Sequence, residues 1–261
     1  MKIRCSCALA LVLATLLSGS SAAWAQLSSF AVLGGSTVTN TNTPTTVNGN
    51  LGVSPGSAVT GFPPGIVTGG TIHAADLAAA QAQTELTTTY NNLAGMACGT
   101  DLTGQDLGGM TLTPGVYCFS TSAQLTGTLT LDAQGNPSAV FVFQIGSTLT
   151  TASASSVLLI NGATDCNVLW QVGSSAILGT GTALQGIIFA DQSITLNTGA
   201  SVSGSVLARI GAVTLDNSHV GLCVGGPAVA AAIPTLSEWA MIAMTTLLLL
   251  SALPVLRRRA A

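Results

Sequence analysis

The sequence has 261 residues, a formal net charge of −3 and only 6% charged residues. Residues 26–232 contain one basic residue, Arg209, against eight acidic residues, which gives this part a net charge of −7. One cation cannot neutralise a phosphate backbone or hold an anionic lipid surface. We therefore expect no nucleic-acid partner and no electrostatic binding to membranes.

The amino-terminal end has the pattern of a secretory signal peptide. Lys2 and Arg4 precede a short apolar run, and Ala23-Trp24-Ala25 supplies small residues on both sides of a cleavage position. The apolar run is too short for a permanent membrane span. We expect residues 1–25 to be removed on export and the mature chain to begin at Gln26.

The next part of the chain predicts short strands followed by one long helix. Residues 30–71 alternate Thr, Val and Gly segments with turn residues such as Pro55-Gly56 and Pro63-Pro64. Composition changes at residues 73–96, where apolar residues recur at helical spacing and glycine is absent before Gly95. We predict a helix at about residues 73–96, with Thr71 as its N-cap.

From Leu102 onward the chain becomes periodic. Four similar segments begin at Leu149, Leu178, Leu196 and Leu215, which are 29, 18 and 19 residues apart, and each follows an apolar strand. Such a period fits one coil of a three-sided β-solenoid, in which equivalent side chains stack at about 4.8 Å. We therefore predict an all-β fold with one long helix, in which the periodic part of the chain forms a three-sided β-solenoid.

Aligning these segments on their leucines predicts a flat outer surface of hydroxyls and methyls. Each leucine is expected to point inward, with the next Thr and the residue two further along pointing outward. Whether Thr150 or Thr151 points outward is left open. The residues predicted to form this surface are Thr150, Thr151, Ser153, Thr180, Thr182, Thr198, Ala200 and Asn217.

Four cysteines remain after removal of the signal peptide: Cys98, Cys118, Cys166 and Cys223. An even number in an exported protein favours disulfides, and three pairings are possible. We favour Cys98–Cys118, which closes a short loop, together with Cys166–Cys223. The spacing does not fit a zinc site, so we expect no metal.

The carboxyl-terminal end contains a second targeting segment. Ile233, Pro234, Thr235 and Leu236 precede an apolar run at residues 239–256, and three arginines follow it. This order resembles the bacterial IPTL-type sorting signals, which an exosortase-like transpeptidase processes. The resemblance implies a transmembrane segment at 239–256 within a sorting signal at 233–261, and a protein exported to the cell surface or beyond. A plain tail anchor is the alternative, and it also places the domain outside the cytoplasm.

Several stretches of the mature chain resemble the ice-binding proteins of the DUF3494 family. They are FAVLGGSTVTNT (30–41), GNLGVSPG (49–56), LTPGVY (112–117), FQIGSTLTT (143–151) and GAVTLD (211–216). The resemblance implies a discontinuous right-handed three-sided β-solenoid over residues 26–232 with the helix packed alongside. Amino-terminal coils are then expected to stack beside carboxyl-terminal ones, so that Thr60 or Thr68 joins the same faces. The resemblance also implies an ice crystal surface as partner, contacted through the outer surface predicted above. A paired replacement of Thr180 and Thr198 by Tyr is expected to abolish this activity without unfolding the domain. The family motif Thr-(Ala/Gly)-x-(Thr/Asn) is complete at residues 68–71, whereas the segments starting at Thr151, Thr180 and Thr198 match only its first two positions.

No pattern predicts catalysis or a cofactor. His73 and His219 have no Ser, Cys or paired acid at motif spacing, and the aspartates sit beside Gly, Asn or Gln in predicted turns. We expect no catalytic residues, no cofactor and no enzyme. The alternative to ice binding is a surface adhesin or extracellular-matrix domain without ice affinity, since threonine ladders also simply stabilise solenoids.

Overall fold

A computed structural model describes residues 27–41 and 45–223 of this protein. The expected signal peptide, the Ile233-Pro234-Thr235-Leu236 motif and the expected span at 239–256 lie outside the described residues. Within those residues no helix is both long and apolar enough to cross a membrane.

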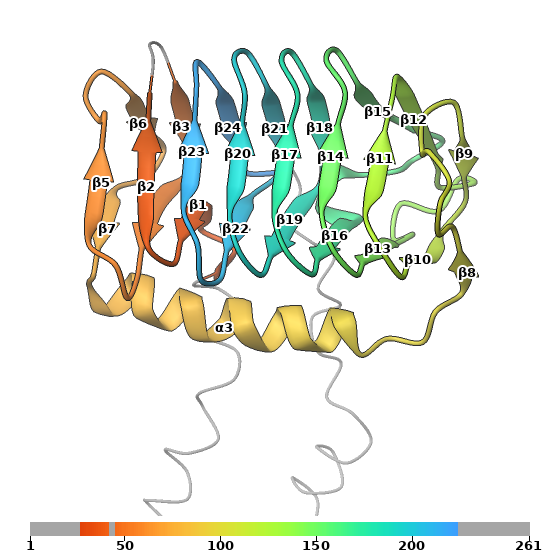
Figure 1. Ribbon diagram of the computed structural model, residues 1–261, viewed down its shortest axis with the longest axis horizontal. Helices are drawn as coiled ribbons and strands as arrows, with labels where there is room; N and C mark the ends of the chain where they lie inside the picture. The colour runs from red at the N-terminus through yellow and green to blue at the C-terminus, as the bar shows by residue number, and fades with distance from the viewer. Residues whose placement is uncertain (1–26, 42–44, 224–261) are drawn as a thin grey trace, which may run out of the picture. The chain divides into compact units, whose positions relative to one another are not determined.

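Three parallel sheets wind into a β-solenoid, which confirms the predicted fold (Figure 1). Sheet A has nine strands, in spatial order β7 (Ile72–Ala74), β4 (Asn50–Val53), β1 (Phe30–Gly34), β22 (Val206–Ala208), β19 (Ile187–Ala190), β16 (Val168–Val172), β13 (Phe141–Ile145), β10 (Gly115–Phe119) and β8 (Thr100–Asp101). Sheet B has seven, β11 (Ala123–Leu125), β14 (Leu149–Thr151), β17 (Ala176–Leu178), β20 (Ile194–Leu196), β23 (Val213–Leu215), β2 (Thr37–Asn40) and β5 (Ala58–Thr60). Sheet C has eight, β6 (Ile66–Thr68), β3 (Thr46–Asn48), β24 (His219–Gly221), β21 (Ser201–Ser203), β18 (Ala183–Gln185), β15 (Ser156–Ile160), β12 (Thr128–Asp132) and β9 (Thr111–Leu112).

The stacking order of the coils differs from their order in the sequence. Strands β1, β2 and β3 of one amino-terminal coil pair with β22, β23 and β24 of the last carboxyl-terminal coil. In Figure 1 the orange β2 lies directly beside the blue β23. The solenoid is therefore discontinuous, as the family resemblance implies, and Thr60 and Thr68 join sheets B and C respectively.

The interior of the solenoid is a continuous apolar core. Every sheet alternates inward aliphatic residues with outward ones, because successive side chains on a strand point to opposite faces. Near one end, the rings of Phe143 and Trp170 stack at 4.0 Å, and Tyr117 stacks on Phe143 at 5.5 Å. Equivalent positions on neighbouring coils thus hold one another in register.

Helix α3 (Leu77–Ala94) covers the outer side of sheet A (Figure 1). It buries Ala79, Ala82, Leu86, Tyr90 and Leu93 in a second apolar cluster with the outward residues of that sheet. Arg209 stabilises the docking, since its guanidinium lies 4.5 Å above the Tyr90 ring and pairs with Asp191 at 2.6 Å.

The helix starts four residues later than its composition predicted. His73 and Ala74 belong to β7 and pair with Gly52 and Val53 of β4. Asp76 is the N-cap, and its side chain accepts the backbone N–H of Ala79. The prediction of Thr71 as N-cap is wrong, because that residue precedes a strand pairing that periodicity alone does not show.

Both disulfides have the predicted pairing. Cys98–Cys118 joins the segment after α3 to β10, and Cys166–Cys223 joins the 3₁₀ helix η1 (Asp165–Asn167) to the segment after β24. Asp165 lies beside the second disulfide in a cluster of metal-ligand residue types. Its two cysteines are bonded to each other, so the cluster offers no thiolates to a metal.

Candidate functional site

The outer face of sheet B presents one central column of side chains, one from each of seven coils. The strand register places the following residues side by side: Gln124, Thr150, Ile177, Thr195, Thr214, Thr39 and Thr60. Five of the seven are threonines. In Figure 1 the strands of this sheet run side by side across the front of the molecule.

A second outward column runs parallel to the first on six of the seven coils, two residues earlier in the sequence. Its members are small: Thr148, Ser175, Ser193, Ala212, Thr37 and Ala58. The two columns lie about 7 Å apart along the strands, and neighbouring coils are about 4.8 Å apart. None of these side chains is charged, and all except Gln124 and Ile177 are Thr, Ser or Ala. The two columns therefore form a neutral surface made mostly of hydroxyls and methyls.

Inward residues of the same strands hold this surface rigid. Leu149, Ala176, Ile194, Val213 and Val38 alternate with the outward columns, and all five are completely buried. Each threonine of the central column is β-branched and therefore stiff at χ1. The face is consequently ordered mainly by the core beneath it.

The corner between sheets B and C contains most of the predicted site residues. Ser153, Thr180 and Thr198 are exposed at equivalent positions of the turns that follow β14, β17 and β20. Asn217 lies in the shorter turn after β23, with a positive φ of 47°. These four residues border the face of sheet B but do not belong to its columns.

Three of the predicted site residues point into the core, so their predicted outward orientation is wrong. Thr151 is 3% exposed, and Thr182 and Ala200 are both 0% exposed. The hydroxyls of Thr151 and Thr182 bond to each other inside the corner. Thr150 is the outward member of its pair, which settles the alternative that the sequence left open.

The misplaced residues have two physical causes, of which the first is the alignment of the first segment. Leu149 pairs with Ala176 rather than with Leu178, and the residue level with Leu178 is Thr151, next to Leu125. The first leucine is therefore two residues out of step with the other three. In addition, the chain turns directly after Leu178 and Leu196, so the alternation of a strand does not extend to Thr182 or Ala200.

The sequence reasoning included Thr60 only through the family resemblance, and it missed Thr39, Thr195 and Thr214 of the central column. A usable signal was present, since Thr37-Val38-Thr39, Thr148-Leu149-Thr150 and Ser193-Ile194-Thr195 each place a buried aliphatic residue between two hydroxyl residues. The complete family motif at residues 68–71 lies elsewhere. It begins at Thr68, the last residue of β6, and continues through the corner between sheets C and A.

The other two sheets offer less regular surfaces. Sheet A lies beneath α3. The outer side of sheet C carries large and small side chains together: Leu158 is 51% exposed, Ile66 is 50% exposed, and the imidazole of His219 bonds to Thr46. Among the described sheets, sheet B therefore has the most uniform outer face.

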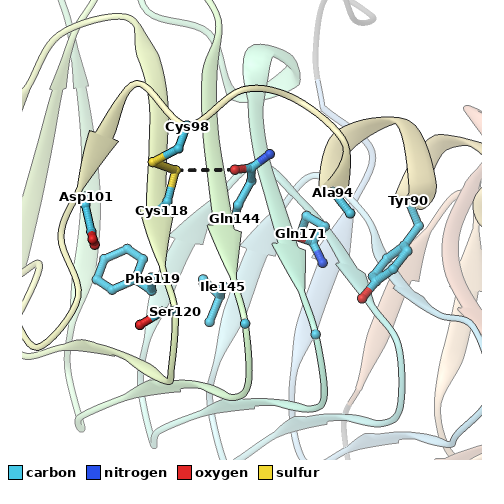
Figure 2. Close-up of a pocket in the computed structure, with 12 residues that line it drawn as sticks. Tyr90, Ala94, Cys98, Asp101, Cys118, Phe119, Ser120, Gln144, Ile145 and Gln171 are labelled. Atoms are coloured by element: carbon cyan, nitrogen blue, oxygen red, sulfur yellow. Dashed lines mark hydrogen bonds between the residues drawn. A yellow bond between two sulfur atoms is a disulfide. The ribbon is translucent and has the colours of Figure 1, made fainter.

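A shallow groove of about 520 Å³ lies at the carboxyl end of α3, beside the Cys98–Cys118 disulfide (Figure 2). Its polar groups serve the docking of the helix. The Gln144 amide donates to the carbonyls of Leu93 and Met96 at 2.6 and 2.9 Å. Burial raises the pKa of Tyr90, whose ring lies under Arg209. These contacts hold α3 in place, so the docking of the helix explains the polar groups that line the groove.

The comparison with known families agrees with this architecture. The sequence profile of ice-binding-like proteins matches residues 32–221, which is most of the chain. The chain belongs to the ice-binding-like family. A second profile, the IPTL-CTERM motif, matches residues 231–260.

Individual members of the ice-binding-like family are similar over most of their length. An ice-binding protein of Nostoc sp. (strain HG1) is 58% identical over 209 residues, which cover 79% of this chain and 77% of that protein. The solved structure of an ice-binding protein from an Antarctic biological consortium has a TM-score of 0.74 and 46% identity, covering 76% of this chain and 90% of that one. The DUF3494 domain of Shewanella frigidimarina ice-binding protein 1 has a TM-score of 0.72 and 31% identity, covering 77% and 96%.

Proposed function

We propose that this protein binds ice through the outer face of sheet B and thereby hinders ice growth and recrystallisation. The observation that carries the proposal is the pair of uncharged columns on that face, in which five of seven central positions are threonine. Membership of the ice-binding-like family supports the same ligand.

Threonine suits contact with ice for a physical reason. Its methyl group excludes disordered water, while its hydroxyl holds an ordered water. Each such contact is weak, so adsorption requires many contacts that are already in place before binding. The solenoid supplies them, because parallel strand pairing fixes the spacing of the columns and the buried core fixes their height.

The absence of charged side chains from the two columns also supports ice as the ligand. An ice surface carries no net charge, so a charged side chain would have to give up its hydration without gaining an ion partner. The acidic residues of the described chain lie outside the two columns, and Asp191 already pairs with Arg209 near the corner between sheets A and B.

The IPTL-CTERM match at residues 231–260 supports export and presentation at the cell surface. We propose that an exosortase-like enzyme processes this tail and that residues 239–256 hold the chain in the membrane beforehand. An ice binder delivered in this way would hold the cell against ice or condition the ice around it.

The test compares purified wild-type protein with Thr195→Tyr, a change at the middle of the central column. Thermal hysteresis and ice recrystallisation inhibition are measured, and circular dichroism checks the fold. Thr130→Tyr is the matched control, because Thr130 is a mid-strand threonine on the outer side of sheet C. We expect activity in the wild type and the control and its loss in Thr195→Tyr. A folded wild type without any effect on ice would leave the surface-adhesin alternative.

A further inference from the structure

We propose that Ile177 bounds the effective ice-contacting area, which is centred on the junction between Thr214 and Thr39. This inference rests on the proposed function and narrows it to part of the sheet B face. The junction is defined as the pairing of β23 with β2, where the last carboxyl-terminal coil meets the first amino-terminal one.

The first argument is the continuity of the central column. Thr195, Thr214, Thr39 and Thr60 occupy four successive coils without interruption. At about 4.8 Å per coil, their outer members are about 14 Å apart. The hydroxyls of Thr39 and Thr60 lie 3.1 Å apart, so this end of the column is ordered at the side-chain level as well.

The second argument is what lies on the other side. Ile177 occupies the next position of the column and is 39% exposed. Its side chain replaces the threonine hydroxyl with an ethyl group, which is longer and cannot bond to water. Beyond it, Thr150 stands between Ile177 and Gln124, two side chains larger than its own. The column is therefore uniform on one side of Ile177 and uneven on the other.

The third argument is that backbone hydrogen bonds join the two coils that meet at the junction. The N–H groups of Gly35 and Ser36 both donate to the carbonyl of Gly211, at 3.0 and 3.1 Å. The N–H of Thr41 donates to the carbonyl of Leu215 at 2.9 Å, and its hydroxyl bonds to the same oxygen. The two ends of the domain therefore present one continuous surface.

A matched set of tyrosine substitutions tests the position of the area. Thr39→Tyr and Thr214→Tyr place the same bulk on each side of the junction, and Thr150→Tyr places it beyond Ile177. Thr130→Tyr on sheet C is again the control. We expect most of the thermal hysteresis to be lost in both junction variants, and a much smaller change in Thr150→Tyr. Thr214→Val is the milder variant if a tyrosine prevents folding, and a partial loss is expected there.

Substitution of Ile177 tests its own role. Ile177→Thr would join Thr150 to the other four threonines, so we expect higher thermal hysteresis than in the wild type. Unchanged or lower activity in Ile177→Thr would overturn the role given to this residue. An equal loss in Thr150→Tyr and Thr214→Tyr, with an active wild type, would overturn the position of the area while leaving ice binding intact. A wild type with no activity would instead contradict the proposed function itself.

Discussion

The hydroxyl oxygens of Thr151 and Thr182 lie 2.7 Å apart in the buried corner between sheets B and C. Thr151 also accepts the backbone N–H of Gly179 at 2.9 Å, and Thr182 donates to the carbonyl of Ala152 at 3.3 Å. The pair thus joins two successive turns through side chains that are themselves fully bonded. Both residues belong to the framework of the corner rather than to its surface.

Replacement of Thr182 by valine should therefore reduce stability and not ice activity. The change keeps the shape but leaves buried polar groups without a partner, which costs about 1–3 kcal/mol in the free energy of unfolding. Chemical denaturation measures this loss. Thr180→Val is the control in the same turn, and because Thr180 is exposed its effect should stay within about 0.5 kcal/mol. Equal effects of the two variants would contradict the buried arrangement.

Gly35→Ala should destabilise the junction between the first and last coils. A Cβ atom at residue 35 would overlap the carbonyl oxygen of Arg209 and lie 2.6 Å from the carbonyl carbon of Ile210. A methyl group placed too close to backbone atoms lowers the free energy of unfolding by about 1–3 kcal/mol, because neither backbone segment can move aside freely. Thermal unfolding measures the effect. The control is Gly115→Ala, where the nearest atoms belong to Tyr117 at 3.9 Å. A Gly35→Ala protein as stable as the control would show that this close approach does not exist in solution.

Asp76 should make the stability of the protein fall at acid pH. Its pKa is lowered from 3.8, first by the hydrogen bond from the N–H of Ala79 and then by the one from His73. Because the pKa of Asp76 is lower in the folded state, its ionised side chain contributes to the free energy of unfolding at neutral pH. This contribution disappears as pH falls below 3.8 and through the lowered folded-state pKa. Unfolding followed by circular dichroism across this range measures it.

Two substitutions separate the cap of Asp76 from its charge. Asp76→Ala removes the N-cap and should lower the free energy of unfolding by about 0.5–2 kcal/mol at neutral pH. Asp76→Asn keeps a capping oxygen, so we expect near wild-type stability at neutral pH and a weaker dependence on acid. An unchanged acid dependence in Asp76→Asn would assign that dependence to other carboxylates.

The disulfides should stabilise the domain without contributing to the ice-contacting face. Cys98 and Cys118 are 20 residues apart, and Cys166 and Cys223 are 57 apart. In the chain-entropy account, loss of the shorter loop costs about 3 kcal/mol and loss of the longer one about 4 kcal/mol. Paired Cys→Ser variants, compared by chemical denaturation, measure the two values. Each folded variant should keep its thermal hysteresis in the cold, and a loss there would show that the disulfide positions sheet B.

The sequence by itself predicted the architecture because that architecture has strong local signals. Apolar strands with turn residues at a period of 18 or 19 residues predict solenoid coils, and the predicted strands correspond to β13, β16, β19 and β22. Helical spacing over residues 73–96 predicted α3, although strand pairing at β7 moved its start. The even number of cysteines and their spacing led to the pairing that the structure confirms.

Only the tertiary structure decided which threonines face outward. Side chains alternate along a strand, so their direction depends on where each strand ends and how many residues the turn contains. The corner between sheets B and C has two residues after β11, four after β14 and three after β23. Each change in turn length shifts the phase of the pattern, and sequence alignment on one leucine cannot detect it. The pairing of Thr39 with Thr214 is likewise absent from any local pattern, because it depends on two distant coils stacking in the folded chain.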